Sequence, residues 1–408
     1  MRIMKERGRI LIVSLSTALT LLVLIGALLG QDKSSQEPYR PLAVLSEVLS
    51  RIQTDYVEDP SFPRVTEGAL HGLLESLDPY SSYLSPAEYK EYQKGSRGDA
   101  SIGAVVFKRG GMAGIVTTLP GGPAAKAGLS AGDIIESIDG ISSQDLSYAE
   151  VVSQLEGPAG SAVSITVVRE RAQDPQVFEL KREIFHVPEI EARIVEPGIG
   201  YMKVVALPKG EAQKIAGKIQ DLRRIGARKF ILDLRDNAWG DMQEGMATAN
   251  LFVRRGLIGY VEGQQYPRQS FTAEESKFIS EEPLEILVNE STGGAAEIAA
   301  AAIMENHRGD VVGGRTFGIG SIQKTIPLED GSALILSVAK YYSPVGKQIQ
   351  ESGVTPTVVV LEDRDVVSLN GEDESEEEPA QPAKPQEDLP LKRAIELLKA
   401  QNAAPQAA

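Results

Sequence analysis

The sequence predicts a mixed α/β (α+β) chain, with an N-terminal membrane helix, a helical region, a β-domain and an α/β domain. Three observations carry this prediction. Residues 10–30 form an uncharged apolar run, and residues 98–185 are rich in strand patterns punctuated by glycines. Residues 186–360 alternate strand and helix patterns, which is typical of a largely parallel sheet covered by helices. The length of 408 residues allows roughly two or three such cores.

The N-terminal segment predicts a membrane anchor. The run 10–30 has the length that a helix needs to cross about 30 Å of hydrocarbon, and the basic flank of residues 1–9 should stay in the cytoplasm. A cleaved signal peptide is the alternative, but its apolar region is usually shorter and no clear A-x-A site follows. We therefore expect a single-pass protein of the bacterial inner membrane, with its bulk facing the periplasm or the cell exterior.

Residues 38–97 predict a helical region. Apolar residues recur at helical spacing in 41–57 and 65–77, and a further helix follows the turn at Asp78-Pro79. We expect His71 to be a partly buried packing residue of the second helix. Near the other end, residues 361–388 carry eleven acidic and two basic side chains, which predicts a disordered linker. Residues 389–400 then return to helical spacing.

The composition excludes several chemistries. There is no cysteine, which rules out disulfides, thiolate metal sites and a cysteine nucleophile. The three histidines are His71, His186 and His307, too scattered for a histidine-rich metal centre. We expect no metal and no cofactor. A net charge of −15 argues against nucleic acid as a partner, because binding a phosphate backbone requires lysine and arginine.

A strand pair at 101–119, broken by Gly110-Gly111, begins the β-domain, and a helix at 147–155 and a strand at 161–170 follow. Between them stands P-A-x-x-A-G-L-x-x-G-D-x-I at 123–135. This string resembles a PDZ domain of the bacterial periplasmic kind over residues 98–185. The resemblance implies binding of an extended peptide as an added strand, with backbone amides that capture its C-terminal carboxylate. The matching carboxylate loop is Ser101, Ile102, Gly103 and Ala104, although an ordinary glycine-containing strand start is the alternative.

The α/β domain contains predicted strands at 198–207, 229–236 and 285–290 and helices at 211–226 and 295–307. The string NESTGGAAEI at 289–298 is a strand-to-helix turn. Such a turn exposes a side chain above the sheet, and the helix N-terminus offers amides to an oxyanion. A nucleophile would therefore sit here.

The order of segments from residue 40 to 400 resembles the C-terminal processing peptidases, also called tail-specific serine peptidases. The resemblance rests on LLESLDPYSSYLSPAEY, the PDZ segment, LDLRDN, VNE with AAEI, GGRTFGIGSIQ, DGSALILSVAKYYSPVGKQIQ and LKRAIELLK. It implies a tail-specific protease-like α/β domain at 186–360. That family uses a serine nucleophile and a lysine general base, because a neutral, desolvated lysine can take the serine proton.

Three positions depart from the family pattern. The family's turn, S-A-S-A-S-E-I, places its nucleophile at Gly294 of this chain, and its T-F-G-K-G motif places the lysine at Ile319. The glutamine that orients the lysine is retained as Gln323. Where the family has N-x-G-G and draws an oxyanion-hole amide, this chain has Asn237-Ala238-Trp239-Gly240, so that Trp239 replaces the first glycine and Gly240 keeps the second. Trp239 is expected either in the core or as a plug in the old cleft.

Glycine has no nucleophilic atom and isoleucine has no basic one, so we predict a homologue without catalysis. We expect it to bind protein C-termini through the PDZ segment, or to regulate an active protease relative, as a homo- or hetero-oligomer. An active serine-type endopeptidase using Ser291 or Thr292 with another base is one alternative, although both residues suit helix capping better. A structural envelope protein with an unused groove is the other.

Two further groups are weak candidates for that other base. His307 lies about one helix length from the turn, roughly 18–20 Å away. Lys324 should point to the opposite face of its strand from Ile319, because side chains alternate, and it is expected to be an exposed charge.

Overall fold

The computed structural model describes residues 40–95, 100–169, 174–184, 186–361 and 387–401, and the chain divides into two compact units, residues 1–69 and 70–408. The predicted flank at 1–9, the predicted anchor at 10–30 and most of the acidic linker lie outside the described residues. Within the described ranges, none of the helices has both the length and the apolar character needed to cross a membrane. The first unit contains α2 (Arg40–Asp55) and the start of α3 (Phe62–Glu75), close to the helices predicted there.

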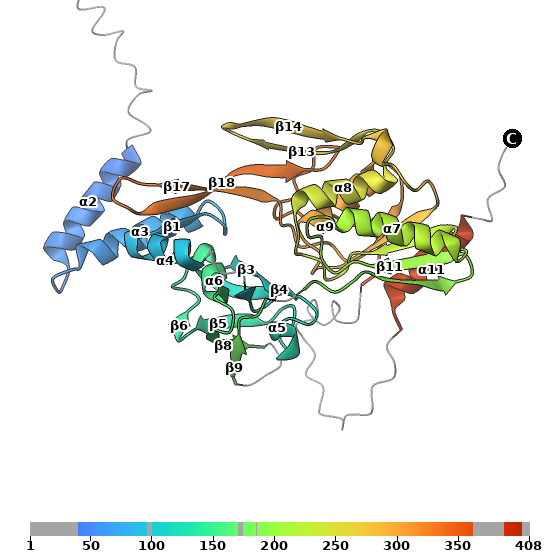
Figure 1. The fold of residues 1–408 in the computed structure, drawn as a ribbon. Coiled ribbons are helices and arrows are strands. Elements are labelled where there is room, and N and C mark those ends of the chain that lie inside the picture. The colour runs from blue at the N-terminus through green and yellow to red at the C-terminus, as the bar shows by residue number, and fades with distance from the viewer. Residues whose placement is uncertain (1–39, 96–99, 170–173, 185, 362–386, 402–408) are drawn as a thin grey trace, which may run out of the picture. The chain divides into compact units, whose positions relative to one another are not determined.

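The second unit contains two sheets built mainly by the α/β segment, and a larger and a two-stranded sheet built by the segment 100–184 (Figure 1). The first of them has the order β10-β11-β12-β15-β16-β19. Its members are β10 (Glu191–Glu196), β11 (Ile199–Lys203), β12 (Lys229–Asp233), β15 (Leu284–Val288), β16 (Asp310–Gly313) and β19 (Val358–Val359). All neighbours pair in parallel except β10 with β11. The largely parallel sheet predicted from the alternating pattern is therefore confirmed.

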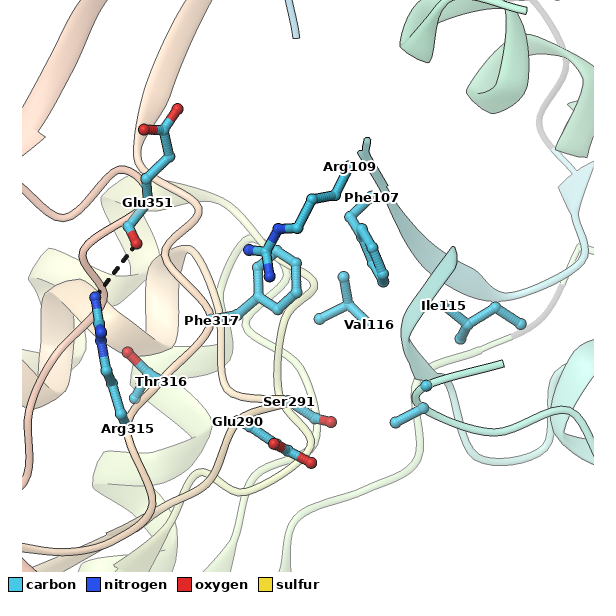
Figure 2. A pocket seen from close by; sticks show the side chains of 12 residues that line it. Phe107, Arg109, Ile115, Val116, Glu290, Ser291, Arg315, Thr316, Phe317 and Glu351 are labelled. Atoms are coloured by element: carbon cyan, nitrogen blue, oxygen red, sulfur yellow. Dashed lines mark hydrogen bonds between the residues drawn. The ribbon is translucent and has the colours of Figure 1, made fainter. Parts of the chain in front are cut away.

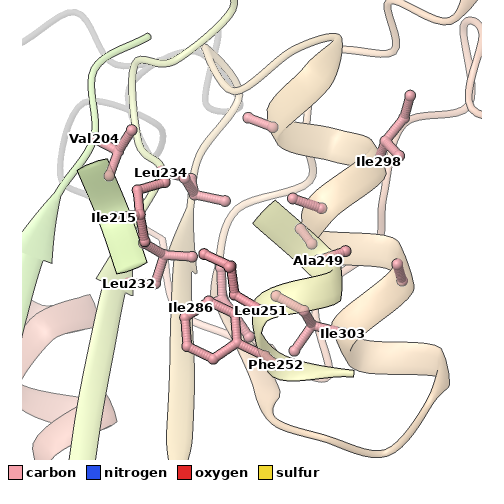
Figure 3. Close-up of a cluster of buried hydrophobic side chains, with 14 of the residues drawn as sticks. Val204, Ile215, Leu232, Leu234, Ala249, Leu251, Phe252, Ile286, Ile298 and Ile303 are labelled. Atoms are coloured by element: carbon pink, nitrogen blue, oxygen red, sulfur yellow. The ribbon is translucent and has the colours of Figure 1, made fainter. Parts of the chain in front are cut away.

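Helices cover both faces of this parallel sheet. The core on one face joins the strands to α7 (Glu211–Arg224), α8 (Met242–Phe252) and α9 (Ala295–Glu305), and Figure 3 shows part of it. On the other face, α11 (Leu389–Ala400) packs Ala394 and Leu398 against Ile231 and Leu287. Successive strand residues thus face opposite helical layers, as a sheet buried on both sides requires.

The helices α8 and α9 approach each other closely. A Cβ atom on Gly245 of α8 would lie 2.2 Å from the backbone oxygen of Ala295 of α9, so only glycine fits there. The small alanine side chains of α9 allow the backbones of the two helices to come this close. The pairing fixes the start of α9 against α8, next to the turn at 289–294.

The second sheet of the α/β segment was not foreseen from the sequence. It has the order β1-β18-β13-β14, with β17 paired to β18. Its strands are β1 (Ser82–Leu84), β13 (Leu257–Gly263), β14 (Tyr266–Thr272), β17 (Ser321–Pro327) and β18 (Ala333–Tyr342), and η2 (Glu275–Lys277) follows β14. The short α4 (Pro86–Gly95) lies next to β1 in the sequence. His71, near Tyr83 of β1, is half-buried, as expected.

The described residues of the segment 100–184 form a β-domain that includes two helices. The sheet order is β3-β4-β5-β8-β9, with β6 paired to β5, and β2 pairs β7 separately. The elements are β2 (Ala100–Ser101), β3 (Ala104–Arg109), β4 (Met112–Thr118), α5 (Pro123–Lys126), β5 (Ile134–Ile138), β6 (Ile141–Ser142), α6 (Tyr148–Leu155), β7 (Glu156–Gly157), β8 (Ala162–Val168) and β9 (Gln176–Lys181). Strand β3 stands at the edge of its sheet. Ser147 and Glu150 form a reciprocal capping box that starts α6.

Candidate functional site

The turn between β15 and α9 is stabilised by hydrogen bonds of its own side chains. The Thr292 hydroxyl is fully buried, donates to the Leu234 carbonyl at 2.9 Å and accepts from the Asn289 N–H at 3.0 Å. The Ser291 N–H donates to Oδ1 of Asn289 at 3.2 Å. Helix α9 has Gly294 as its N-cap residue. The expectation that Ser291 or Thr292 caps the helix is therefore wrong, because the Thr292 hydroxyl points back to the strand ends.

Gly294 occupies the position where a nucleophile was expected. Its backbone has φ 60° and ψ −120°, a conformation that residues with a side chain adopt only at a cost of about 1–3 kcal/mol. This is the sharp strand-to-helix turn that serine hydrolases use to expose a nucleophile. A Cβ atom built on Gly294 would meet its nearest neighbours, Met242 and Ala238, at 3.6 and 3.9 Å, which are ordinary contacts. The turn thus retains the room for a side chain.

A buried carboxylate joins this turn to the segment of Ile319. Oε2 of Glu297 accepts from the backbone N–H of Gly294 and of Ile319, each at 2.8 Å. Oε1 accepts from the Gly318 N–H at 2.7 Å and from the Thr316 hydroxyl. Burial raises the pKa of Glu297 to about 7, and the four donors oppose a larger rise. Sequence reasoning did not single out Glu297, although an acid three residues into a helix is a recognisable capping signal.

Ile319 lies against the same turn. A Cβ atom on Gly293 would come within 2.9 Å of Cδ1 of Ile319, so the isoleucine side chain covers the turn just before Gly294. The structure therefore brings together the two positions that the family pattern assigns to a nucleophile and a base. Gln323 is exposed and donates to the Ser321 hydroxyl at 2.7 Å, and Lys324 is exposed as expected.

The loop 236–240 is anchored at several points. The Gly293 N–H donates to the Asn237 carbonyl at 2.8 Å, and the Asn237 amide donates to the Val204 carbonyl at 2.8 Å. The Leu207 N–H donates to the Trp239 carbonyl at 2.9 Å. Gly240 has φ 152°, and a Cβ atom there would lie 2.4 Å from the Leu207 oxygen, so glycine is required.

Trp239 is neither a core residue nor strained at positive φ. Its side chain is 44% exposed, which excludes the expectation that it lies in the core. The described non-glycine residues with positive φ are Asp139, Asp236, His307 and Glu351, so Trp239 adopts an ordinary backbone conformation. It lines a groove of the β-domain, together with residues of β3, α6 and the predicted carboxylate loop.

This groove lies between the edge strand β3 and α6 and encloses a cavity of about 150 Å³. It is lined by Ser101, Ile102, Gly103, Ala104, Val105, Val106, Leu119, Tyr148, Val152, Leu155, Glu156 and Trp239. The four predicted loop residues thus fall together at one site. Gly103 has φ 73°, and its N–H donates to the Ser101 hydroxyl at 3.1 Å. A free strand edge beside a helix is the arrangement that accepts a peptide as an added strand.

A larger cavity, of about 540 Å³, lies above Ser291 (Figure 2). Its wall combines residues of β3 and β4 with the turn at 290–291 and the segment 315–317. The guanidinium of Arg109 stands 5.8 Å from the ring centre of Phe317. Among the described residues that line this cavity, the titratable ones are arginines and glutamates, with no lysine or histidine near Ser291. His307 is exposed, just after the C-terminal end of α9.

The comparisons with known proteins agree with this architecture. The profile of peptidase family S41 matches residues 198–360, and a PDZ domain profile matches residues 114–169. A carboxy-terminal-processing protease of Bartonella bacilliformis is 33% identical over 335 residues, which span 80% of this chain and 76% of that protein. This chain belongs to the carboxy-terminal-processing peptidases of family S41.

Two further relatives support the assignment. The carboxy-terminal processing protease CtpA of Bacillus subtilis is 30% identical over 84% of this chain and 74% of its own length. The solved structure of a photosystem II D1 C-terminal processing protease superposes with a TM-score of 0.63 at 26% identity, covering 80% of this chain and 96% of that one. Membership in the family and the presence of the PDZ domain, both predicted from sequence motifs, are confirmed.

Proposed function

We propose that this S41 homologue is a non-catalytic, PDZ-containing protein that binds protein C-termini. The observation that carries the proposal is the pair Gly294 and Ile319, which share Oε2 of Glu297 but supply neither a nucleophile nor a base. Around them the sheet, the turn and the groove are complete. Loss of a whole nucleophile–base pair usually removes most of the catalytic advantage, whereas peptide binding at a separate groove is unaffected by it.

The proposal includes the location of the protein. Residues 10–30 act as a single-pass anchor in the inner membrane, with residues 31–408 in the periplasm or at the cell exterior. There the protein captures C-termini, or binds an active protease relative and regulates it, as a homo- or hetero-oligomer. The support for this part is the apolar run and its basic flank.

The test uses residues 31–408 purified from a host that lacks active relatives. The protein is incubated with an unfolded substrate that has an apolar C-terminal tail, and product is followed by mass spectrometry over time. We expect no time-dependent cleavage, while an active carboxy-terminal-processing protease run in parallel degrades the same substrate. Time-dependent cleavage by the purified protein would overturn the proposal.

One observation in the structure favours a rival function, that of an active endopeptidase. Ser291 lines the cavity of about 540 Å³, whereas the Thr292 hydroxyl is occupied by Leu234 and Asn289. A fluorophosphonate probe distinguishes the two functions. Labelling of wild-type protein that is lost in Ser291→Ala would favour the peptidase, and absence of labelling supports the non-catalytic protein.

A further inference from the structure

Trp239 belongs to the peptidase segment in sequence but to the PDZ groove in space. It follows β12 in the loop 236–240, more than eighty residues after α6, yet it lines the groove formed by β3 and α6. We propose that Trp239 is a specificity-determining wall of the peptide groove, which selects an apolar residue near the free C-terminus of the bound peptide. The proposal rests on the peptide binding proposed above and adds the residue that decides which peptides are held.

The groove has an apolar interior that matches this selection. Besides Trp239, its lining contains Ile102, Val106, Leu119, Tyr148, Val152 and Leu155, against the charged side chain of Glu156. Its cavity of about 150 Å³ is comparable to one that accommodates a benzene-sized group. An aliphatic or aromatic side chain therefore fits, and an acidic one would be desolvated beside Glu156 without a cationic partner in the described lining.

A bound peptide would remove the half-exposed indole of Trp239 from water. At 44% exposed, it presents apolar surface to solvent at the groove, and a peptide added along the edge of β3 would cover that surface. Burial of a large aromatic side chain is among the strongest single contributions to an interface. Trp239 therefore acts as a wall that peptide binding buries.

The loop presents Trp239 in a fixed position. The Thr117 hydroxyl of β4 donates to the Asp236 carbonyl at 3.0 Å, which ties the loop to the PDZ domain. The Asp236 N–H donates to Oδ1 of Asn289 at 3.0 Å, and the Leu207 N–H donates to the Trp239 carbonyl at 2.9 Å. Because these bonds hold the backbone before a peptide arrives, little conformational entropy is lost on binding.

Trp239 is also the single tryptophan of the chain, so its own fluorescence reports the site. Residues 31–408 are titrated with a short peptide that ends in three apolar residues and a free carboxylate. We expect the emission to shift to the blue on saturation, because the indole leaves water. An amidated peptide, and one ending in aspartate, should produce no shift at the same concentrations. Unchanged emission at saturation by the free peptide overturns the proposal.

Polarisation of the same peptide, carrying a fluorescein label, measures affinity independently of the tryptophan. Trp239→Ala should weaken binding about tenfold and Trp239→Phe by less than about threefold, the scale of truncating an interface aromatic. Ile141→Ala is the matched control, because Ile141 is a PDZ residue with 46% exposure that does not line the groove. It should bind like wild type.

The outcomes separate this proposal from the function on which it rests. Equal or tighter binding by Trp239→Ala overturns the specificity role and leaves C-terminus binding intact. Absence of binding to wild-type protein, or equal binding of free and amidated peptides, overturns C-terminus binding itself. Loss of selectivity between apolar and aspartate tails in Trp239→Ala supports the role of Trp239 in selecting an apolar residue.

Discussion

Gly294 and Ile319 donate their backbone N–H groups to the same oxygen atom, Oε2 of Glu297, each at 2.8 Å. Their positions, 25 residues apart in sequence, are those that the family's motifs assign to a nucleophile and a base. One buried carboxylate thus holds the backbone of these two positions together. The proposed loss of catalysis therefore concerns the two side chains and not the backbone that carries them.

This arrangement predicts that peptidase activity can be introduced at the two positions. The double variant Gly294→Ser/Ile319→Lys should cleave an unfolded, apolar-tailed substrate at least about tenfold faster than wild type, because a nucleophile and its base act as a unit. Each single variant should stay at the wild-type background. The room around a Cβ at position 294 makes the serine possible, despite its strained backbone. Rates are measured from product formation with equal amounts of folded protein.

Two results would count against this prediction. Equal activity of Ile319→Lys alone would show that the serine is not the nucleophile. A folded double variant without activity would show that the two side chains are not sufficient for catalysis in this chain.

Glu297 should be a large contributor to stability. Glu297→Ala removes a fully buried acceptor and leaves three backbone N–H groups and the Thr316 hydroxyl without it, so we expect the free energy of unfolding to fall by about 3–5 kcal/mol. Glu297→Gln keeps one acceptor oxygen and should cost about 1–3 kcal/mol. Urea denaturation measures both.

The control for this series is Glu329→Ala, since Glu329 is exposed on the turn between β17 and β18. It should change stability by less than about 0.5 kcal/mol. An effect of Glu297→Ala no larger than that of the control would mean that the shared carboxylate does not organise the turn.

The sequence predicted the parts of the fold that depend on strong local patterns. Strands β12 and β15 are short apolar runs, and α9 is a long run of small helix-forming residues, so their existence followed directly. Helix α8 was missed because its sequence carries Gly245, whose use becomes clear only against α9. Strand β17 is mostly polar and exposed, and its pairing with β18 rather than its own pattern defines it.

The candidate functional site was also predicted only in part from the sequence. The family motifs identified Gly294 and Ile319, and the structure places them at one turn. The place of Trp239 could not be read from its neighbours in sequence, because it depends on contact between segments that are distant in the chain, including the bond from Thr117 to Asp236. Glu297 was overlooked because its partners at 316–319 are distant in sequence as well.

A buried acid on β15 predicts that stability depends on pH. Glu285 is fully buried, its Oε2 has no hydrogen-bond partner, and its neighbour across the strands is Asp310. Burial, with a smaller effect of Asp310, raises the pKa of Glu285 to about 8, from an ordinary value of 4.5. The pKa of Glu285 is higher in the folded than in the unfolded state. The contribution of this group to the free energy of unfolding is therefore complete below pH 4.5 and is lost as pH rises towards 8.

We therefore expect the free energy of unfolding to fall between pH 5 and 8 in wild type, by at most about 1.4 kcal/mol per pH unit from this group. Glu285→Gln should remove this part of the slope, because the amide does not ionise and still accepts from Gln401. The measurement is urea denaturation at pH 5, 6, 7 and 8. Parallel curves for the two proteins would show that Glu285 does not titrate in this range.

The docking of α11 on the parallel sheet gives the last prediction. Leu398 is fully buried against the sheet, whereas Leu389 of the same helix is 40% exposed. Leu398→Ala should lower the free energy of unfolding by about 2–4 kcal/mol, through lost burial and the cavity left behind, and Leu389→Ala by less than about 1 kcal/mol. Both substitutions remove the same atoms from one helix, so the difference between them reports mainly the burial of Leu398. Equal urea midpoints for the two variants would mean that α11 is not packed on this face in solution.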